Sequence, residues 1–329
     1  MNKFIDNLVY FARFVAQLPS VYHPKGEPHV FLFSTRRSGS TLLRDMIYSQ
    51  PGFNYVDQPT STIQVNPYTR FLPNSDLNQY INLNESDLKK FKKYIDNILK
   101  RKYIIRSQWQ VWDKHYHWVW GRYVLKILNA SPLIDWFQET YAESGRIVYL
   151  TRHPIATSLS IIQRGWGITA NSYLNNSYFR NKYLSEETVC IGNQILENGS
   201  LLEKHVLGWC LENLVPLSTW QERSWLTVSY ENIVSNPVSV SNRICSILDL
   251  PNPERMMNVV RKPTRTAQSS SRKSILVNGS KNRASDWWTK IRNEERSKID
   301  EILKCFQINL YSANSPYPDE EFDTWNLIS

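Results

Sequence analysis

The sequence predicts an α/β fold in which helices cover both faces of a central parallel sheet. Short apolar runs of strand character alternate along the chain with longer segments of helical period, which is the order that such a sheet requires. Some of these runs end in loops of small and hydroxyl residues that open directly into a helix. With 329 residues the chain is long enough for one large domain, and we predict a single domain over 1–329 with a core of about 29–310.

The predicted elements alternate in chain order. An apolar run such as "VFLF", "RYVLKIL" or "RIVYLT" marks a strand, and a segment of helical period follows it. Proline is well tolerated in the first turn of a helix, so Pro154 marks a helix start. The predicted strands are 29–34, 53–56, 122–128, 146–151 and 225–229. The predicted helices are 41–50, 86–101, 132–142, a helix from Pro154, 200–221, 237–249 and 293–306.

Other segments lack a clear strand or helix pattern. Residues 164–198 are polar and aromatic, and we expect an insertion there that acts as a mobile lid, while 261–285 form a polar run. The N-terminal stretch is apolar, but Asp6, Asn7 and Arg13 interrupt it well short of a membrane span, so we predict an amphipathic helix. Without a targeting signal, we expect a cytoplasmic protein that does not contact a membrane.

Composition narrows the class of ligand. Lys and Arg outnumber Asp and Glu by 39 to 30, and the resulting formal charge of +9 favours an anionic ligand such as nucleic acid, a membrane surface or a charged nucleotide. The four cysteines form no C-x-x-C pair and do not cluster with the histidines, so we expect neither a metal site nor disulfides. The basic run 89–102 is most simply the solvated face of a helix, and nucleic-acid binding is the alternative.

The loop after the first strand has the features of an anion site. In "FSTRRSGSTLLRDM", residues 33–46, Gly39 lets the backbone approach a ligand, and Ser38, Ser40 and Thr41 add hydroxyl donors at a helix N-terminus. The ATP- and GTP-binding version of this loop requires G-x-x-x-x-G-K-[ST]. Here no glycine precedes Gly39 at that distance and no lysine follows it. The loop is therefore P-loop-like, but a P-loop kinase is a poor fit.

A second loop of this kind follows the strand 146–151. In "LTRHPIATSLS", Arg152 lies at the strand end and Ser160 follows eight residues later on the helix, so both side chains can converge on one dianion. Tyr230 lies at the end of a further strand, where its ring can contact a base. Anion sites at neighbouring strand ends indicate a ligand with two separated phosphates.

These loops, together with "TVSYENIVSNP" at 227–237 and "GSKNRASDWW" at 279–288, resemble the sulfotransferases that use 3′-phosphoadenosine-5′-phosphosulfate (PAPS). The resemblance implies their fold, PAPS as cofactor and PAP as product. It places the 5′-phosphosulfate at the first loop, the 3′-phosphate at Arg152 and Ser160, and the adenine near Tyr230. A late basic segment before Asp286 and Trp287 closes over the 3′-phosphate. The implied cofactor-binding residues are Arg37, Ser38, Gly39, Ser40, Thr41, Leu42, Arg152, Ser160, Tyr230, Lys281 and Arg283.

Departures from the family pattern direct the choice of a base. The members that act on phenols and steroids have a catalytic histidine two residues after a lysine, but Leu128 follows Lys126 here. The carbohydrate- and tyrosylprotein-type members use a glutamate after the first helix, and the corresponding residue is Asp57, so the chain resembles these and bacterial members more closely. We predict Asp57 as the general base, with Arg37 and Lys126 neutralising charge on the leaving phosphate. No metal is required.

The sequence says least about the acceptor, the molecule that receives the sulfuryl group. The segment "QWQVWDKHYHWVWGRY" offers His115 and His117 as alternative bases. Its tryptophans, with these histidines, are either packing residues or an acceptor platform. We expect a small organic acceptor with a hydroxyl or nitrogen, such as a bacterial secondary metabolite, with a saccharide or cationic metabolite as alternatives. We expect no nucleic-acid partner, although a basic nucleic-acid-binding protein is the rival class. The platform candidates are Trp109, Trp112, Trp118 and Trp120.

Overall fold

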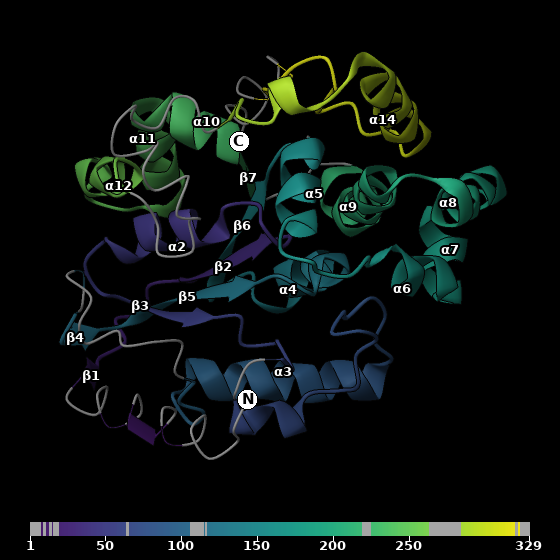
Figure 1. Cartoon of the computed structure of the whole chain (residues 1–329). Coiled ribbons are helices and arrows are strands. Elements are labelled where there is room, and N and C mark those ends of the chain that lie inside the picture. Colours follow the sequence, from purple (N-terminus) through teal and green to yellow (C-terminus); the bar gives the residue numbers. More distant parts are fainter. Residues whose placement is uncertain are drawn as a thin grey trace.

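A five-stranded parallel sheet forms the centre of the described part of the chain, in the order β3-β5-β2-β6-β7 (Figure 1). The computed structural model describes residues 20–63, 66–105, 115, 117–218, 225–262 and 284–319, with the single positions 8, 11, 12, 15 and 322. The predicted parallel α/β sheet is confirmed. Its strands are β2 (His29–Ser34), β3 (Phe53–Asp57), β5 (Arg122–Ile127), β6 (Gly145–Thr151) and β7 (Leu226–Ser229).

Alternating side chains of the strands build a separate apolar layer on each face of the sheet. On β2, Val30 and Leu32 belong to one buried cluster, whereas Phe31 and Phe33 belong to the other. This alternation is expected for strands that are covered on both faces. The first face packs against α2 (Ser40–Tyr48), α10 (Tyr230–Ser235), α11 (Pro237–Leu248) and α12 (Pro253–Val260). The second packs against α3 (Glu85–Leu99), α4 (Ile134–Thr140), α5 (Pro154–Ile162), α9 (Leu201–Ser218) and α14 (Asn293–Cys305).

A short parallel pair, β1 (Val21–Tyr22) with β4 (Val119–Trp120), lies beside the amino end of β5. Trp120 is buried there, and its ring centre lies 4.6 Å from that of Tyr22 and 4.6 Å from that of Tyr123. Trp120 is thus a packing residue, which decides one of the alternatives left open by the sequence.

The predicted helices are present, with ends within a few residues of the predicted ones. The sequence analysis missed α10 and α12, and the 3₁₀ turns η1 (Pro67–Phe71), η3 (Ser131–Leu133) and η5 (Trp288–Lys290). Among the described helices, none combines the length and the apolar character needed to cross a bilayer. Most of the predicted N-terminal helix and most of 261–285 lie outside the described residues.

The aperiodic segment 164–198 contains three short helices in the described chain: α6 (Ala170–Asn175), α7 (Ser177–Tyr183) and α8 (Glu186–Asn198). Two of them begin at a side-chain cap, because the Asn176 side chain accepts a hydrogen bond from the amide of Phe179, and that of Ser185 from the amide of Thr188. Helices α6 and α7 are too short to show a clear period in the sequence, and α8 buries only Gly192. Their proposed action as a lid stays a prediction.

Candidate active site

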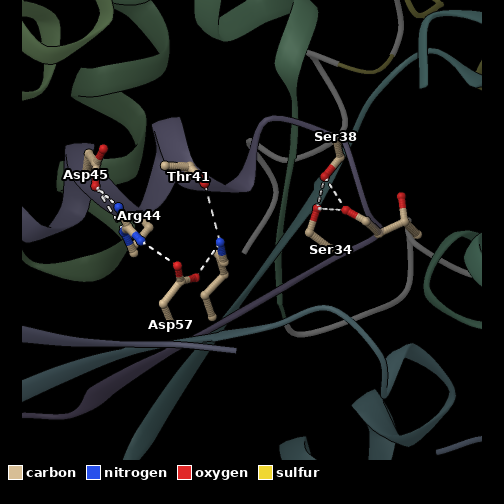
Figure 2. A network of polar contacts seen from close by, with 8 residues as sticks. Ser34, Ser38, Thr41, Arg44, Asp45 and Asp57 are labelled. Atoms are coloured by element: carbon tan, nitrogen blue, oxygen red, sulfur yellow. Dashed lines mark hydrogen bonds and ion pairs between the residues drawn. The ribbon is translucent and has the colours of Figure 1, made fainter. Parts of the chain in front are cut away.

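The loop 34–39 connects the carboxyl end of β2 to the N-terminus of α2 and is tied down by its own hydroxyl groups. Ser34 Oγ donates to the carbonyl of Leu150 at 2.9 Å. Ser38 Oγ, which lies beside Ser34 in Figure 2, donates to the carbonyl of Thr35 at 2.7 Å. Arg37 and Gly39 have φ values of 64° and 96°, so the chain turns sharply before the helix. The free amides of the first turn of α2 therefore start from a rigid loop, as an anion site requires.

Gly39 lies directly under the ring of Tyr230. A Cβ atom at position 39 would come within 2.3 Å of Tyr230 Cδ2, a contact that real side chains do not make. The left-handed φ and this close approach both demand glycine. The structure thus brings Tyr230, at the start of α10, against the loop.

Hydrogen bonds join Arg37 of this loop to Arg152 and Ser160. Arg37 Nε donates to Ser160 Oγ at 2.9 Å, and Arg152 Nη1 donates to the carbonyl of Arg37 at 3.0 Å. The Arg152 guanidinium also lies 4.5 Å from the centre of the Tyr230 ring. Burial lowers the pKa of Arg37, and the neighbouring Arg164 and Arg152 lower it further. Like charges held this close favour an anion between them.

The residues behind Arg152 fix the end of β6. Glu231 accepts hydrogen bonds from the amide of His153 at 3.0 Å and from the Tyr311 hydroxyl at 3.1 Å. Burial raises the pKa of Glu231, although these bonds and Arg152 oppose the rise. The His153 ring stacks on Trp287 with centres 4.3 Å apart, and burial lowers the pKa of His153 to about 3. The Asp286–Trp287 pair thus docks beside Arg152, while Lys281 and Arg283 lie outside the described residues.

Asp57 and Lys126 lie together on the α2 side of the sheet. They are register partners on β3 and β5, and they form an ion pair. Lys126 Nζ also donates to Thr41 Oγ1 at 3.3 Å, while Arg44 Nη1 lies 3.0 Å from Asp57 Oδ2 (Figure 2). Two of the predicted catalytic residues, Asp57 and Lys126, are therefore brought together with Thr41, whereas the third, Arg37, contacts Arg152 and Ser160. The sequence analysis missed Arg44, although its position three residues after Thr41 on one helix is the signal that points to it.

A family model described as "Sulfotransferase family" matches residues 28–254, which include β2, the loop, β3, β5, β6 and β7. The chain belongs to the sulfotransferase family. A comparison with curated proteins finds no match.

Solved sulfotransferases of similar extent accompany this match. The sulfotransferase domain from the curacin biosynthetic pathway is 17% identical, with 87% of this chain and 99% of that chain covered and a TM-score of 0.42. The domain from the Synechococcus PCC 7002 olefin synthase is 18% identical, with coverage of 88% and 98% and a TM-score of 0.41. Mouse sulfotransferase SULT7A1 complexed with PAP is 14% identical, with coverage of 96% and 94% and a TM-score of 0.40. The family assignment rests on the family model.

A further ion pair of the sulfotransferase joins the loop to α9. Arg36 Nη2 lies 3.8 Å from Glu212 Oε1 and donates to the carbonyl of Gly167 at 3.4 Å. Burial raises the pKa of Glu212, and Arg36 opposes the rise. This pair was also missed, because its partners lie far apart in the sequence. It ties the loop to the segment that leads into α6.

The predicted alternative base His117 lies elsewhere in the sulfotransferase. Its Nε2 is 3.3 Å from the carbonyl of Tyr48 at the end of α2, and it precedes β4 at the amino end of the sheet. Asp57 lies at the carboxyl end of β3, so the two are at opposite edges. Trp118, in the same segment as His115 and His117, is exposed. Trp109 and Trp112 lie outside the described residues.

In the described part of the sulfotransferase, no group of three or more His, Cys, Asp or Glu side chains is arranged to hold a metal ion. The described cysteines have no disulfide partners: Cys210 and Cys245 are buried, Cys305 is partly buried and Cys190 is exposed.

Proposed function

We propose that this sulfotransferase takes its sulfuryl group from PAPS and transfers it to a hydroxyl or nitrogen of a small organic acceptor. One observation carries the proposal: two anion-binding elements stand side by side at neighbouring strand ends. The first is the loop 34–39 with the N-terminus of α2, and the second is Arg152 with Ser160, both of which are hydrogen-bonded to Arg37 of the loop. A ligand with one phosphate at each end of a nucleoside suits this spacing of charges.

The residues present fit such a ligand. Arg152 Nε is buried and has no hydrogen-bond partner among the described residues, so it has a donor to offer to an anion. Gly39 leaves the loop backbone free of a side chain at the point of closest approach. In this proposal Arg152 and Ser160 hold the 3′-phosphate, and residues 37–42 hold the 5′ end. Tyr230 lies near the base, and Lys281 and Arg283 cover the 3′-phosphate.

Groups of the protein then neutralise the charge on the leaving phosphate and take the proton of the acceptor. PAPS, when bound, supplies an activated sulfuryl group. Lys126, Arg37 and the α2 amides neutralise the charge that grows on the leaving phosphate, which is the main task in transfers of this type. Asp57 is proposed to take the acceptor's proton. Because its oxygens face Arg44 and Lys126, it has to exchange one of these contacts for the acceptor.

The acceptor class is proposed to be a small secondary metabolite, with a saccharide as the alternative. A panel of a phenol, an amino sugar, a guanidine and an alkyl alcohol, each incubated with PAPS while PAP release is measured, tests this directly. A rate above that with water for any member defines the acceptor chemistry. No increase over water for any of them would argue against a small acceptor of these classes.

Thermal unfolding with PAP tests the donor. A ligand that binds only the folded protein stabilises it by about 2.7 kcal/mol at a hundred times its dissociation constant, so PAP is expected to raise the Tm by several degrees. Stabilisation by RNA or DNA without any by PAP, with a steep salt dependence, would replace the proposal by a nucleic-acid-binding function. A magnesium-dependent response to ATP would favour a kinase.

A further inference from the structure

Arg44 is an almost fully buried arginine in the middle of α2. Only 3% of the residue is exposed, and its guanidinium carbon lies 4.2 Å from the centre of the Tyr55 ring on β3. Its Nε donates to Asp45 Oδ1 at 2.9 Å, and its Nη1 lies 3.0 Å from Asp57 Oδ2. A buried cation is retained only where its charge is paired, and the pairing here includes the predicted base.

Asp57 is shared between two cations on different elements. Arg44 on α2 faces Asp57 Oδ2, and Lys126 on β5 pairs with Asp57 Oδ1 (Figure 2). Asp57 is 7% exposed and Lys126 is 3% exposed. The other charged or titratable groups facing this network are Asp45 and Tyr55. Each oxygen of Asp57 thus has its own cation, and removal of either cation leaves a buried carboxylate with one cation in place of two.

The pKa directions agree with this geometry. Burial lowers the pKa of Lys126, and Arg44 lowers it further, but Asp57 raises it back in part. Burial also acts to lower the pKa of Arg44, yet Asp45 and Asp57 outweigh it, so the pKa of Arg44 is raised. Arg44 therefore stays charged, and the carboxylate between it and Lys126 is the group that holds both cations in place.

We propose that Arg44 is a positioning residue that holds Asp57 as an anion and, through Asp57, fixes Lys126 beside Thr41 at the N-terminus of α2. This inference rests on the proposed function, because Lys126 is the cation proposed to neutralise the leaving phosphate. Lys126 Nζ pairs with Asp57 and donates to Thr41 Oγ1 at 3.3 Å, so the position of the carboxylate fixes the ammonium group beside Thr41. Loss of Arg44 frees one oxygen of Asp57, which lets the carboxylate rotate and Lys126 follow it.

The test compares Arg44→Met and Arg44→Lys with a matched control, Arg122→Met. Arg122 is also a buried arginine that stacks on a β3 ring, 4.5 Å from the centre of Phe53, but it lies at the amino end of β5 and donates to the carbonyl of Pro28 at 2.8 Å. All variants are assayed by PAP release from PAPS, with the best acceptor of the panel or with water, and by PAP affinity.

We expect Arg44→Met to lower turnover about 10- to 100-fold with PAP affinity within about threefold, and to move the acid limb of kcat/KM to higher pH by about one unit. The shift follows because a carboxylate that has lost a neighbouring cation takes up a proton more readily. Arg44→Lys is expected to restore most of the turnover. Arg122→Met is expected to lower stability but to leave the pH profile unchanged. An Arg44→Met profile that matches that of Arg122→Met overturns the proposal.

Thermal unfolding without any ligand gives a second readout. Arg44→Met and Asp57→Asn are each expected to lower the Tm, and the double variant is expected to lose less than the two losses added together, because Asp57→Asn has already removed the carboxylate that Arg44 faces. Additive losses would contradict the proposed coupling. If wild type bound no PAP, the proposed function would fail, while this cycle would still report on Arg44 and Asp57. If Arg44→Met does not fold, Arg44→Lys and Arg44→Gln carry the same comparisons.

Discussion

In the network around Asp57 each named cation faces a carboxylate, whereas in the cluster around Arg152 guanidinium groups lie next to one another. Arg44 and Lys126 are paired with Asp57 in the first. Arg37 is held near Arg152 and Arg164 in the second, and these neighbours lower its pKa after burial does. Glu231 stands behind Arg152, but both of its oxygens accept hydrogen bonds from other groups.

This difference indicates that the two clusters have different roles. A network whose charges are already paired is rigid before any ligand arrives, and preorganised charge is what stabilises a transition state. A cluster of like charges is strained until an anion enters, so it contributes binding energy. We therefore expect variants of the first cluster to change turnover and variants of the second to change affinity.

Lys126→Met is expected to have the largest effect. It removes the cation at the N-terminus of α2 and leaves Asp57 without one partner, so turnover is expected to fall about 10³-fold, while PAP affinity changes little. Rapid-mix measurement of PAP release, with calorimetry for PAP affinity, provides the two numbers. Lys92→Met, which breaks an exposed pair with Asp96 on α3, is the control and is expected to leave both unchanged. An affinity loss as large as the turnover loss would erase the distinction between the clusters.

Asp57→Asn is expected to lower turnover about 10²-fold with PAP affinity nearly unchanged, because it keeps the size of the side chain but removes proton acceptance and charge. The measurement is repeated across pH, since an acceptor nitrogen that is already neutral needs little help from a base. Normal turnover by a folded variant of lower Tm would make Asp57 a purely structural residue.

Arg152→Ala tests the second cluster. Charged hydrogen bonds are worth roughly 1.5 to 3 kcal/mol, so PAP is expected to bind about 10- to 150-fold more weakly. Binding of an analogue without the 3′-phosphate is expected to change far less. Calorimetric titration with both ligands is the measurement, and equal losses would show that Arg152 does not contact that phosphate.

Gly39→Ala tests the contact between the loop 34–39 and Tyr230, whose ring lies beside Arg152 in the second cluster. A side chain at φ 96° costs about 1 to 2 kcal/mol, and the Cβ must also displace the Tyr230 ring. The Tm is expected to fall by several degrees. Gly26→Ala serves as the control, because Gly26 also has a positive φ, 79°, but nothing lies within 4 Å of its Cβ position. An equal loss in both variants would mean that the Tyr230 contact contributes nothing.

His117→Ala is expected to have the smallest effect, with turnover within about twofold of wild type, because His117 lies at the amino edge of the sheet. Steady-state turnover at two pH values checks this. A collapse of turnover in this variant, with Asp57→Asn still active, would move the proton acceptor into the tryptophan-rich segment.

The sequence alone was enough for the strands of the central sheet, for most of the helices that cover it and for the two loops. Apolar runs such as "VFLF" and "RIVYLT" report strands because a strand buried on both faces needs apolar side chains at every position. The glycine and the hydroxyl residues of 34–41 predict an anion-binding loop, because few other residues adopt the backbone conformation of such a loop. The contact between Arg37 and Ser160 was less accessible, since it joins residues 123 positions apart.

Only the tertiary structure decided what surrounds the predicted catalytic residues. Asp57 and Lys126 become neighbours because β5 lies between β3 and β2, an order that periodicity in the sequence does not carry. Arg44 enters the network because the packing of α2 on the sheet turns that face of the helix toward β3. Local patterns determine which residues form a strand or a loop, but the partners of a buried charge depend on long-range packing, which no local pattern contains.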